Sequence, residues 1–307
     1  MRAVHYESFG GAEVLQIGEM PDPPIGPDTV AVRVRASSVN PVDWKIRQGY
    51  LQAAYPHHLP VIPGWDVSGV VEAVGPAVVT GLQAGDEVWG YIRRDDVQLG
   101  TAAELVAAPE RTIAKKPQRL TFEEAAAVPL AGLTAYQGLV DALEVQPGER
   151  VLVHAASGGV GQFAVQIARS RGCTVVGTAS PQNHDHLTQL GASEVLDYNA
   201  GPISAQLSSP VDAVLDLVGG EALADAPSQV TGATRIASIT EAQTVRELGG
   251  QYVFVRPERD HLAALADLVE RGDLTVDIAD TFSLEQIADA HRLSQGGHTR
   301  GKIVVTV

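Results

Sequence analysis

The stretch that decides the fold reads Val151-Leu-Val-His-Ala-Ala-Ser-Gly-Gly-Val-Gly161. Its apolar start predicts a buried strand over residues 151–154, and the pattern of residues 160–171 predicts a helix directly after it. Between the two, Ala156, Gly158 and Gly161 match the spacing G-x-G-x-x-G, with alanine in the first position. Small residues at this spacing let the backbone approach a pyrophosphate, which the N–H groups and the dipole of the helix N-terminus attract.

This turn is therefore a candidate dinucleotide site. The alternative is a tight strand-to-helix turn that binds nothing, but the position of the motif between a strand and a helix favours binding. The candidate cofactor-binding residues in the turn are Ala156, Ser157, Gly158, Gly159, Val160 and Gly161.

The sequence after the turn alternates strands with helices, which predicts an α/β fold built on a doubly wound parallel sheet. The expected strands are 151–154, 174–178, 195–197, 211–216, 235–239 and 252–255, and the expected helices are 160–171, 183–190 and 221–230.

The first 120 or so residues are instead β-rich, because short alternating runs are separated by Gly and Pro clusters. The expected strands there are 1–7, 29–37, 66–74, 87–92 and 102–107. Thr121 and Glu124 form a capping box that begins an Ala-rich helix to about residue 142, interrupted near Pro129. A helix from Pro257 to about Arg271, a short strand and helix, and a strand over 302–307 complete the chain.

The composition limits the class of partner. With 22 basic and 37 acidic residues among 307, the net charge is −15, which argues against a nucleic-acid surface and against binding to an anionic membrane. The single cysteine, Cys173, excludes an internal disulfide and a Cys-rich zinc site, and it is typical of a reducing compartment. With no apparent signal peptide or membrane span, we expect a cytoplasmic protein of two domains.

The end of the second strand of the alternating region bears on the choice of cofactor. An acidic residue there would bind the ribose 2′-hydroxyl of NAD, but no carboxylate follows Ser180 before Asp185. The neutral strand end favours NADPH, with Ser180 and Asn183 as candidate binding residues. No Lys or Arg follows Ser180, however, and His184 and His186 either contribute to this site or merely begin the next helix.

Ordered motifs along the chain carry a family resemblance. They are Asn40-Pro-Val-Asp-Trp-Lys45, Pro63-Gly-Trp-Asp-Val-Ser-Gly-Val-Val71, Gly85-Asp-Glu-Val-Trp-Gly90, Gly132-Leu-Thr-Ala-Tyr136, the glycine-rich turn, Leu190-Gly-Ala192, Asp216-Leu-Val-Gly-Gly220, Gly272-Asp-Leu and Gly301-Lys-Ile-Val304. With these, essentially the whole chain resembles the zinc-independent quinone oxidoreductase branch of the medium-chain dehydrogenase/reductases.

The resemblance implies a GroES-like β-rich catalytic domain formed by residues 1–121 and 256–307, with a Rossmann domain over 122–255 between them in sequence. It implies NADPH bound in the cleft between the two domains. It also implies a homodimer that pairs the last Rossmann strands, residues 251–255, although a merely buried edge strand is the alternative for this segment.

The same comparison predicts that no metal is bound. Zinc alcohol dehydrogenases of the wider family carry Gly-His-Glu where this chain reads Gly64-Trp65-Asp66, so the histidine ligand is missing. Without a Lewis acid, we expect reduction of a quinone or an α,β-unsaturated carbonyl rather than oxidation of an alcohol. An enoyl-thioester reductase and a non-catalytic NADPH-binding structural or sensor protein are the alternatives.

Asn40 and Lys45 are the candidate catalytic residues, because in the resembling enzymes their loop faces the nicotinamide. We hypothesise that Lys45 stabilises an enolate or donates its proton, and that Asn40 positions the substrate or the cofactor amide. The alternatives are a solvated Lys45 paired with Asp43, and an Asn40 that only forms a turn before Pro41.

Further candidates match family positions near the cofactor. Thr134 matches a residue beside the nicotinamide or a phosphate, and Tyr198 a residue near the 2′-phosphate; a helix-bonded hydroxyl and partial burial are the respective alternatives. Arg300 and Lys302 either approach the cofactor or, as we favour, carry simple surface charge. An apolar pocket for flat conjugated substrates is predicted from the aromatic residues Trp44, Tyr50 and Trp65, with core packing as the default for Trp65.

Overall fold

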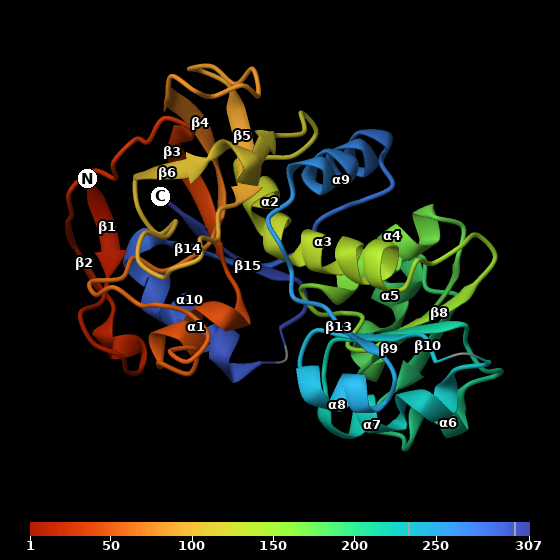
Figure 1. Ribbon diagram of the computed structural model, residues 1–307. Coiled ribbons are helices and arrows are strands. Elements are labelled where there is room, and N and C mark those ends of the chain that lie inside the picture. Colours follow the sequence, from red (N-terminus) through yellow and green to blue (C-terminus); the bar gives the residue numbers. More distant parts are fainter. Residues whose placement is uncertain (233, 298) are drawn as a thin grey trace. The chain divides into compact units, whose positions relative to one another are not determined.

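A computed structural model describes residues 1–232, 234–297 and 299–307. The chain divides into two compact units (Figure 1). The β-rich unit comprises Met1–Leu130, Pro257–Glu270 and Asp277–Val307, and the parallel-sheet unit comprises Ala131–Arg256 and Arg271–Val276. Both chain ends therefore contribute to the β-rich unit.

The β-rich unit is built on a seven-stranded sheet with strand order β14-β15-β3-β4-β5-β7, in which β6 also pairs with β3. Within β3, Val32 and Val34 are buried while Arg33 and Arg35 are exposed, the alternation of a strand with one face on a core. A separate two-stranded sheet joins β1 to β2. The strands of this unit are β1 Arg2–His5, β2 Gln16–Glu19, β3 Thr29–Val39, β4 Asp66–Val74, β5 Glu87–Tyr91, β6 Leu105–Pro109, β7 Ile113–Lys115, β14 Ile278–Ser283 and β15 Lys302–Thr306.

The helices of the β-rich unit include one that the sequence analysis treated as a loop, α1, which begins at Pro41. Proline suits the first turn of a helix, and the Asp43 carboxylate accepts a hydrogen bond from the Asn40 N–H at 2.7 Å. The capping box predicted at Thr121 is confirmed, with Glu124 N donating to Thr121 Oγ1 at 3.2 Å. The helices are α1 Pro41–Arg47, α2 Phe122–Ala127, α9 Arg259–Arg271 and α10 Ile287–Gly296.

The predicted interruption at Pro129 is also present. Helix α3, Pro129–Tyr136, follows α2 and continues as a π-helix over Gln137–Ala142. The unit boundary falls inside α3, after Leu130, later than the expected boundary at residue 121. The reason is local bonding: Asp66 of β4 accepts a hydrogen bond from Leu130 N at 2.7 Å, and Ser68 donates to the Phe122 carbonyl.

The parallel-sheet unit confirms the predicted fold class. Its six strands are parallel and ordered β10-β9-β8-β11-β12-β13, which is the 3-2-1-4-5-6 order of a doubly wound sheet. The strands are β8 Arg150–Val153, β9 Thr174–Ala179, β10 Glu194–Asp197, β11 Ala213–Asp216, β12 Ile236–Ser238 and β13 Gln251–Tyr252. The helices are α4 Gly161–Ser170, α5 His184–Leu190, α6 Ile203–Gln206, α7 Gly220–Gln229 and α8 Ala242–Glu247.

Three details of this unit differ from expectation. Helices α6 and α8 were not predicted, because four and six residues are too short for a periodic signal. Strand β13 pairs over two residues only, fewer than expected. The segment Arg271–Val276 belongs to this unit, since Gln166 of α4 bonds the backbone of Thr275 in both directions.

Candidate functional site

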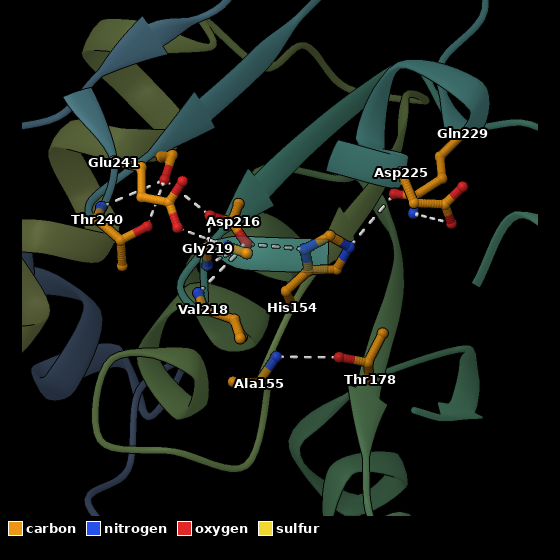
Figure 2. Close-up of polar contacts among 12 residues, drawn as sticks. His154, Ala155, Thr178, Asp216, Val218, Gly219, Asp225, Gln229, Thr240 and Glu241 are labelled. Carbon is orange, nitrogen blue, oxygen red and sulfur yellow. Dashed lines mark hydrogen bonds and ion pairs between the residues drawn. The ribbon is translucent and has the colours of Figure 1, made fainter. Parts of the chain in front are cut away.

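The glycine-rich turn lies between the end of β8 at Val153 and the start of α4 at Gly161. Ala155 has a positive φ of 47°, and its N–H donates to Thr178 Oγ1 at 3.0 Å (Figure 2). Ala156 N donates to the Thr178 carbonyl at 2.9 Å. These two bonds tie the beginning of the turn to the end of the neighbouring strand, β9.

The space around the glycines fits a bound pyrophosphate. A Cβ on Gly161 would lie 2.3 Å from the Ala155 carbonyl oxygen, so the helix packs against the turn at a distance that only glycine permits. A Cβ on Gly158 would meet only the Ala155 carbonyl oxygen, at 3.2 Å, and otherwise open space. The backbone is therefore closely packed at Gly161, whereas Gly158 has open space beside it. Open space at such a position is what a phosphate needs in order to approach the backbone closely.

A neutral polar cluster lies beside the turn, at the carboxyl end of β9. Asn183 Nδ2 lies 3.3 Å from Ser157 Oγ and 3.2 Å from Ser180 Oγ and donates to both. The structure thus brings together three residues that the sequence analysis proposed for the cofactor. The ring of His184 lies 3.3 Å from the Ala179 carbonyl oxygen, and Tyr198, after β10, is exposed.

A second polar cluster lies at the ends of β8 and β11, and the sequence analysis did not identify it as a site (Figure 2). His154 Nδ1 is 3.0 Å from Asp216 Oδ1, and both side chains are fully buried. Asp216 also accepts hydrogen bonds from the backbone N–H groups of Val218 and Gly219 and from Ser238 Oγ. The available signal was that polar residues end two adjacent parallel strands, whose carboxyl ends meet at one edge.

The charge state of Asp216 follows from these contacts. Burial alone raises the pKa of this carboxyl, but the hydrogen bonds from His154 and Ser238 outweigh it and keep the pKa below its ordinary value. Asp216 is thus an ionised carboxylate at neutral pH. Beyond it, Gly219 and Gly220 have positive φ values of 82° and 56°, and Gly220 N donates to Glu241 Oε1 at 2.7 Å.

The β-rich unit contains a buried cluster of its own, around Asp66. Asp66 Oδ2 accepts from Asn40 Nδ2 at 2.8 Å and from Ser38 Oγ at 2.7 Å. Lys302 Nζ donates to Asn40 Oδ1 and lies 3.7 Å from Asp66 Oδ2. The expectation that Lys302 carries surface charge is wrong, because pairing of β15 with β3 buries its side chain to 4% exposure.

Burial shifts the titration of this cluster toward its neutral forms. It raises the pKa of Asp43 to about 7, against the opposing effect of the hydrogen bond from Asn40. It also raises the pKa of Asp66 and lowers that of Lys302, while the attraction between these two groups opposes both shifts. Asn40 itself is 2% exposed, and its side-chain oxygen and nitrogen are already bonded within the cluster.

The outward side of α1 carries a different set of residues. Lys45 is exposed, and its Nζ lies 5.6 Å from the ring centroid of Trp44, which in turn meets Tyr50 edge-on at 6.3 Å. Two of the three aromatic residues predicted for a substrate pocket are therefore adjacent to the candidate catalytic lysine.

The third, Trp65, lies elsewhere and packs edge-on against Tyr55 and Tyr91. It lines a cavity of about 10 Å³ together with Tyr6 and Asp43. Thr134 belongs to the parallel-sheet unit and is buried within α3.

The described residues, 1–232, 234–297 and 299–307, contain no group of three or more His, Cys, Asp or Glu side chains that could hold a metal ion. No helix within these ranges has the length and apolar character needed to cross a membrane.

Comparisons with known proteins cover the whole chain. Residues 26–118 match the alcohol dehydrogenase GroES-like domain, and residues 190–305 match the zinc-binding dehydrogenase family. The chloroplast envelope quinone oxidoreductase homolog of Arabidopsis thaliana is 33% identical in an alignment of 326 positions, gaps included. The alignment covers 99% of this chain and 98% of that protein. The NADPH-dependent alkenal/one oxidoreductase of the same plant is 35% identical in an alignment of 315 positions, which covers 99% of this chain and 79% of that protein.

A solved structure agrees with these relatives. The quinone oxidoreductase from Coxiella burnetii superposes with a TM-score of 0.91 at 34% identity, covering 100% of this chain and 99% of the other. The resemblance inferred from the motifs is thereby confirmed. The chain belongs to the quinone oxidoreductase branch of the medium-chain dehydrogenase/reductase superfamily and is a pyridine-nucleotide-dependent oxidoreductase.

Proposed function

We propose that this protein uses NADPH to reduce a quinone or an α,β-unsaturated carbonyl compound. The observation that carries the proposal is the glycine-rich turn, accessible at Gly158, with the neutral Ser157–Ser180–Asn183 cluster beside it. The names of the relatives, which include a quinone oxidoreductase homolog and an NADPH-dependent alkenal/one oxidoreductase, support the class of acceptor.

The preference for NADPH rests on the end of β9. A carboxylate at this point would bind the two ribose hydroxyls of NAD and repel a 2′-phosphate. The cluster instead offers the hydroxyls of Ser157 and Ser180 and the amide of Asn183, which are neutral groups able to donate hydrogen bonds to phosphate oxygens. Tyr198, exposed after β10, is proposed to contact the same end of the cofactor.

In the reaction, the bound nicotinamide supplies a hydride to the acceptor. A carbonyl acceptor then carries negative charge on oxygen, which needs a hydrogen-bond donor and finally a proton. Lys45 is an exposed ammonium beside Trp44 and Tyr50, whose rings suit a flat conjugated substrate, so we propose that it supplies both. We propose a positioning role for Asn40, since its side chain is engaged by Asp66 and Lys302.

We propose that no catalytic zinc takes part. The support lies in the residues: the second position of Gly64-Trp65-Asp66 is a tryptophan, which has no metal-binding atom and packs between Tyr55 and Tyr91. Elemental analysis of purified, active protein is expected to find less than stoichiometric zinc. Activity that requires one zinc per chain would contradict the proposal.

We also propose a cytoplasmic homodimer formed through residues 251–255. Strand β13 is the last strand of its sheet, and Phe254, half exposed, stacks obliquely against Tyr252 at 6.5 Å. An apolar sheet edge is the kind of surface that pairs with a second copy. Light scattering is expected to give the mass of two chains, and Phe254→Lys to give one chain.

The function is tested by following NADPH oxidation with a panel of quinones, enones and enoyl thioesters, with NADH as the control cofactor. We expect turnover of quinones or enones and a lower kcat/KM with NADH. The variant Lys45→Met is expected to lose most enone turnover while its affinity for NADPH is unchanged. Turnover of thioesters alone, or tight NADPH binding without any turnover, would contradict the proposal in favour of a thioester reductase or a sensor.

A further inference from the structure

The side-chain amide of Gln229 has a defined orientation, and this fixes the atoms around His154. Gln229 Nε2 lies 3.0 Å from Asp225 Oδ2. Asp225 also accepts from Ser204 and Ser228, and these hydrogen bonds outweigh the effect of burial and hold the pKa of Asp225 below its ordinary value. An ionised carboxylate accepts hydrogen bonds and does not donate them, so the NH₂ group of Gln229 faces Asp225 and its oxygen faces His154.

Both nitrogens of the His154 ring therefore face acceptors. Nδ1 is 3.0 Å from the ionised Asp216 carboxylate, and Nε2 is 3.3 Å from Gln229 Oε1 (Figure 2). A neutral imidazole has only one N–H group. The lone pair of its other nitrogen would then face the lone pair of an acceptor oxygen, which is unfavourable in a fully buried site. Only the imidazolium, with two N–H groups, satisfies both contacts.

We propose that His154 is held as a buried imidazolium and is a positioning residue for the dinucleotide. The proposal rests on the glycine-rich turn being the cofactor site, as proposed above. His154 directly precedes that turn, and its partner Asp216 binds the N–H groups of Val218 and Gly219 at the start of α7. The ion pair thus joins two turns at the edge of the parallel sheet where nucleotides bind.

The charge also has a direct use. The chain has a net charge of −15, and the candidate cofactor turn and the Ser157–Ser180–Asn183 cluster contain no Lys or Arg. A positive charge on His154, which directly precedes the turn, neutralises the negative charge of Asp216. The phosphates of the cofactor are then attracted by the dipole of α4 and are not repelled by an uncompensated carboxylate nearby.

The polar and charged groups around the His154 site come from three elements and the segment after β12. Asp216 belongs to β11, and Asp225 and Gln229 belong to α7. Ser238 of β12 donates a hydrogen bond to Asp216, and its Oγ lies 3.0 Å from Thr240 Oγ1. Glu241 accepts a hydrogen bond from Gly220 N at the start of α7. The charged groups among these are all acidic, and none of them would repel a positively charged ring.

The first test is independent of the cofactor. Nitrogen chemical shifts of the histidine rings in the unliganded protein, recorded by NMR from pH 6 to 9, report how many ring nitrogens carry protons. We expect two protonated nitrogens on His154 at pH 7, whereas His291, whose pKa burial lowers to about 3, gives the neutral form in the same spectra. A neutral His154 at pH 7 would overturn the protonation state whatever the protein binds.

The second test measures the consequence for binding. Gln229→Met keeps the side-chain length but removes the oxygen that accepts from Nε2, and Gln166→Met is the matched control, a buried glutamine of the same unit bonded to Thr275. We expect Gln229→Met to show one protonated ring nitrogen on His154 at pH 8 and to raise the Kd for NADPH at that pH by about tenfold, with partial recovery at pH 6. Gln166→Met is expected to do neither.

A third variant separates the proposal from a purely structural role. His154→Asn keeps one donor toward Asp216 but no charge, and it is expected to bind NADPH weakly at every pH, without recovery at pH 6. If His154→Asn binds NADPH with the parent's affinity and pH profile, the positioning role is wrong. If the parent itself shows no NADPH binding while His154 is doubly protonated, the proposed function fails and the protonation state stands.

Discussion

At the scale of single residues, Lys302 tests how the β-rich unit tolerates a buried charge. Its ammonium is enclosed with Asp66 and donates to Asn40, so truncation leaves a buried carboxylate and amide without their partner. We expect Lys302→Met to lower the free energy of unfolding by about 3–5 kcal/mol, as is common when one member of a buried pair is removed. Urea denaturation measures the change.

The matched control for that variant is Lys115→Met. Lys115 pairs with Asp86 at 3.2 Å but is 63% exposed, so its removal is expected to change stability by less than about 1 kcal/mol. Asp66→Asn combined with Lys302→Met removes both charges and is expected to recover part of the loss. Equal effects of the two lysine substitutions would show that the Lys302 cluster contributes no more than a surface pair.

Gly158 allows cofactor binding to be separated from folding at the same scale. A methyl group there meets only the Ala155 carbonyl oxygen, at 3.2 Å, and otherwise occupies the space proposed for the pyrophosphate. Gly158→Ala is expected to leave Tm within a few degrees of the parent and to weaken NADPH binding at least about tenfold, because the backbone must approach the phosphates closely.

Two substitutions bracket that prediction. Gly161→Ala brings a Cβ to 2.3 Å from a backbone oxygen and is expected to lower both Tm and affinity, whereas Gly296→Ala on α10 meets nothing within 4 Å and should change neither appreciably. Isothermal titration and thermal unfolding provide both readouts. Unchanged affinity in Gly158→Ala would place the cofactor phosphates elsewhere.

At the scale of elements, the packing of α1 with α10 brings two buried titratable groups into the same unit, with opposite effects on stability. Asp43 of α1 has a pKa raised from 3.8 to about 7 by burial, so the stability it contributes is complete below pH 4 and is lost as the pH rises to 7. His291 of α10 has a pKa lowered from 6.5 to about 3 by burial and by Arg47, so its stability is complete above pH 6.5 and is lost on acidification.

The two effects oppose each other between about pH 4 and 6.5, each by up to about 1.4 kcal/mol per pH unit. We therefore expect a shallow dependence of parent stability on pH in this window. Asp43→Asn should become less stable on acidification, and His291→Gln more stable, relative to neutral pH. Urea midpoints measured across the window provide the comparison, with the exposed Asp289→Asn of α10 as control. Parallel pH profiles for all four proteins would contradict the assignment.

The elements also show what the sequence predicted and what it could not. Long apolar strands and the turn at 151–161 carry local signals, which is why the doubly wound parallel sheet and the strand-turn-helix unit around this turn were predicted. Short helices such as α6 lack a period, and the burial of Lys302 depends on a partner, Asn40, that is 262 positions away. The pairing of His154 with Asp216 likewise requires two strands to be adjacent, which no local pattern states.

At the scale of the whole molecule, the net charge of −15 acts on every approaching phosphate. The turn and its helix dipole act only within a few ångströms, whereas the field of the chain extends over the Debye length, roughly 30 Å at 0.01 M salt and 8 Å at 0.15 M. A triply phosphorylated cofactor is therefore repelled at a distance and attracted only on arrival. We expect the association rate constant for NADPH to rise roughly two- to threefold between these salt concentrations, because screening removes the repulsion.

Stopped-flow fluorescence of NADPH binding measures this rate directly. The dissociation rate constant is expected to change less, since the contacts that determine it are short and partly buried. Nicotinamide mononucleotide, with a single phosphate, is the control ligand and should show a weaker dependence of association on salt. An association rate that falls as salt is added would mean that a positive local potential reaches beyond the turn, and the repulsion inferred from the net charge would then be wrong for the path by which the cofactor enters.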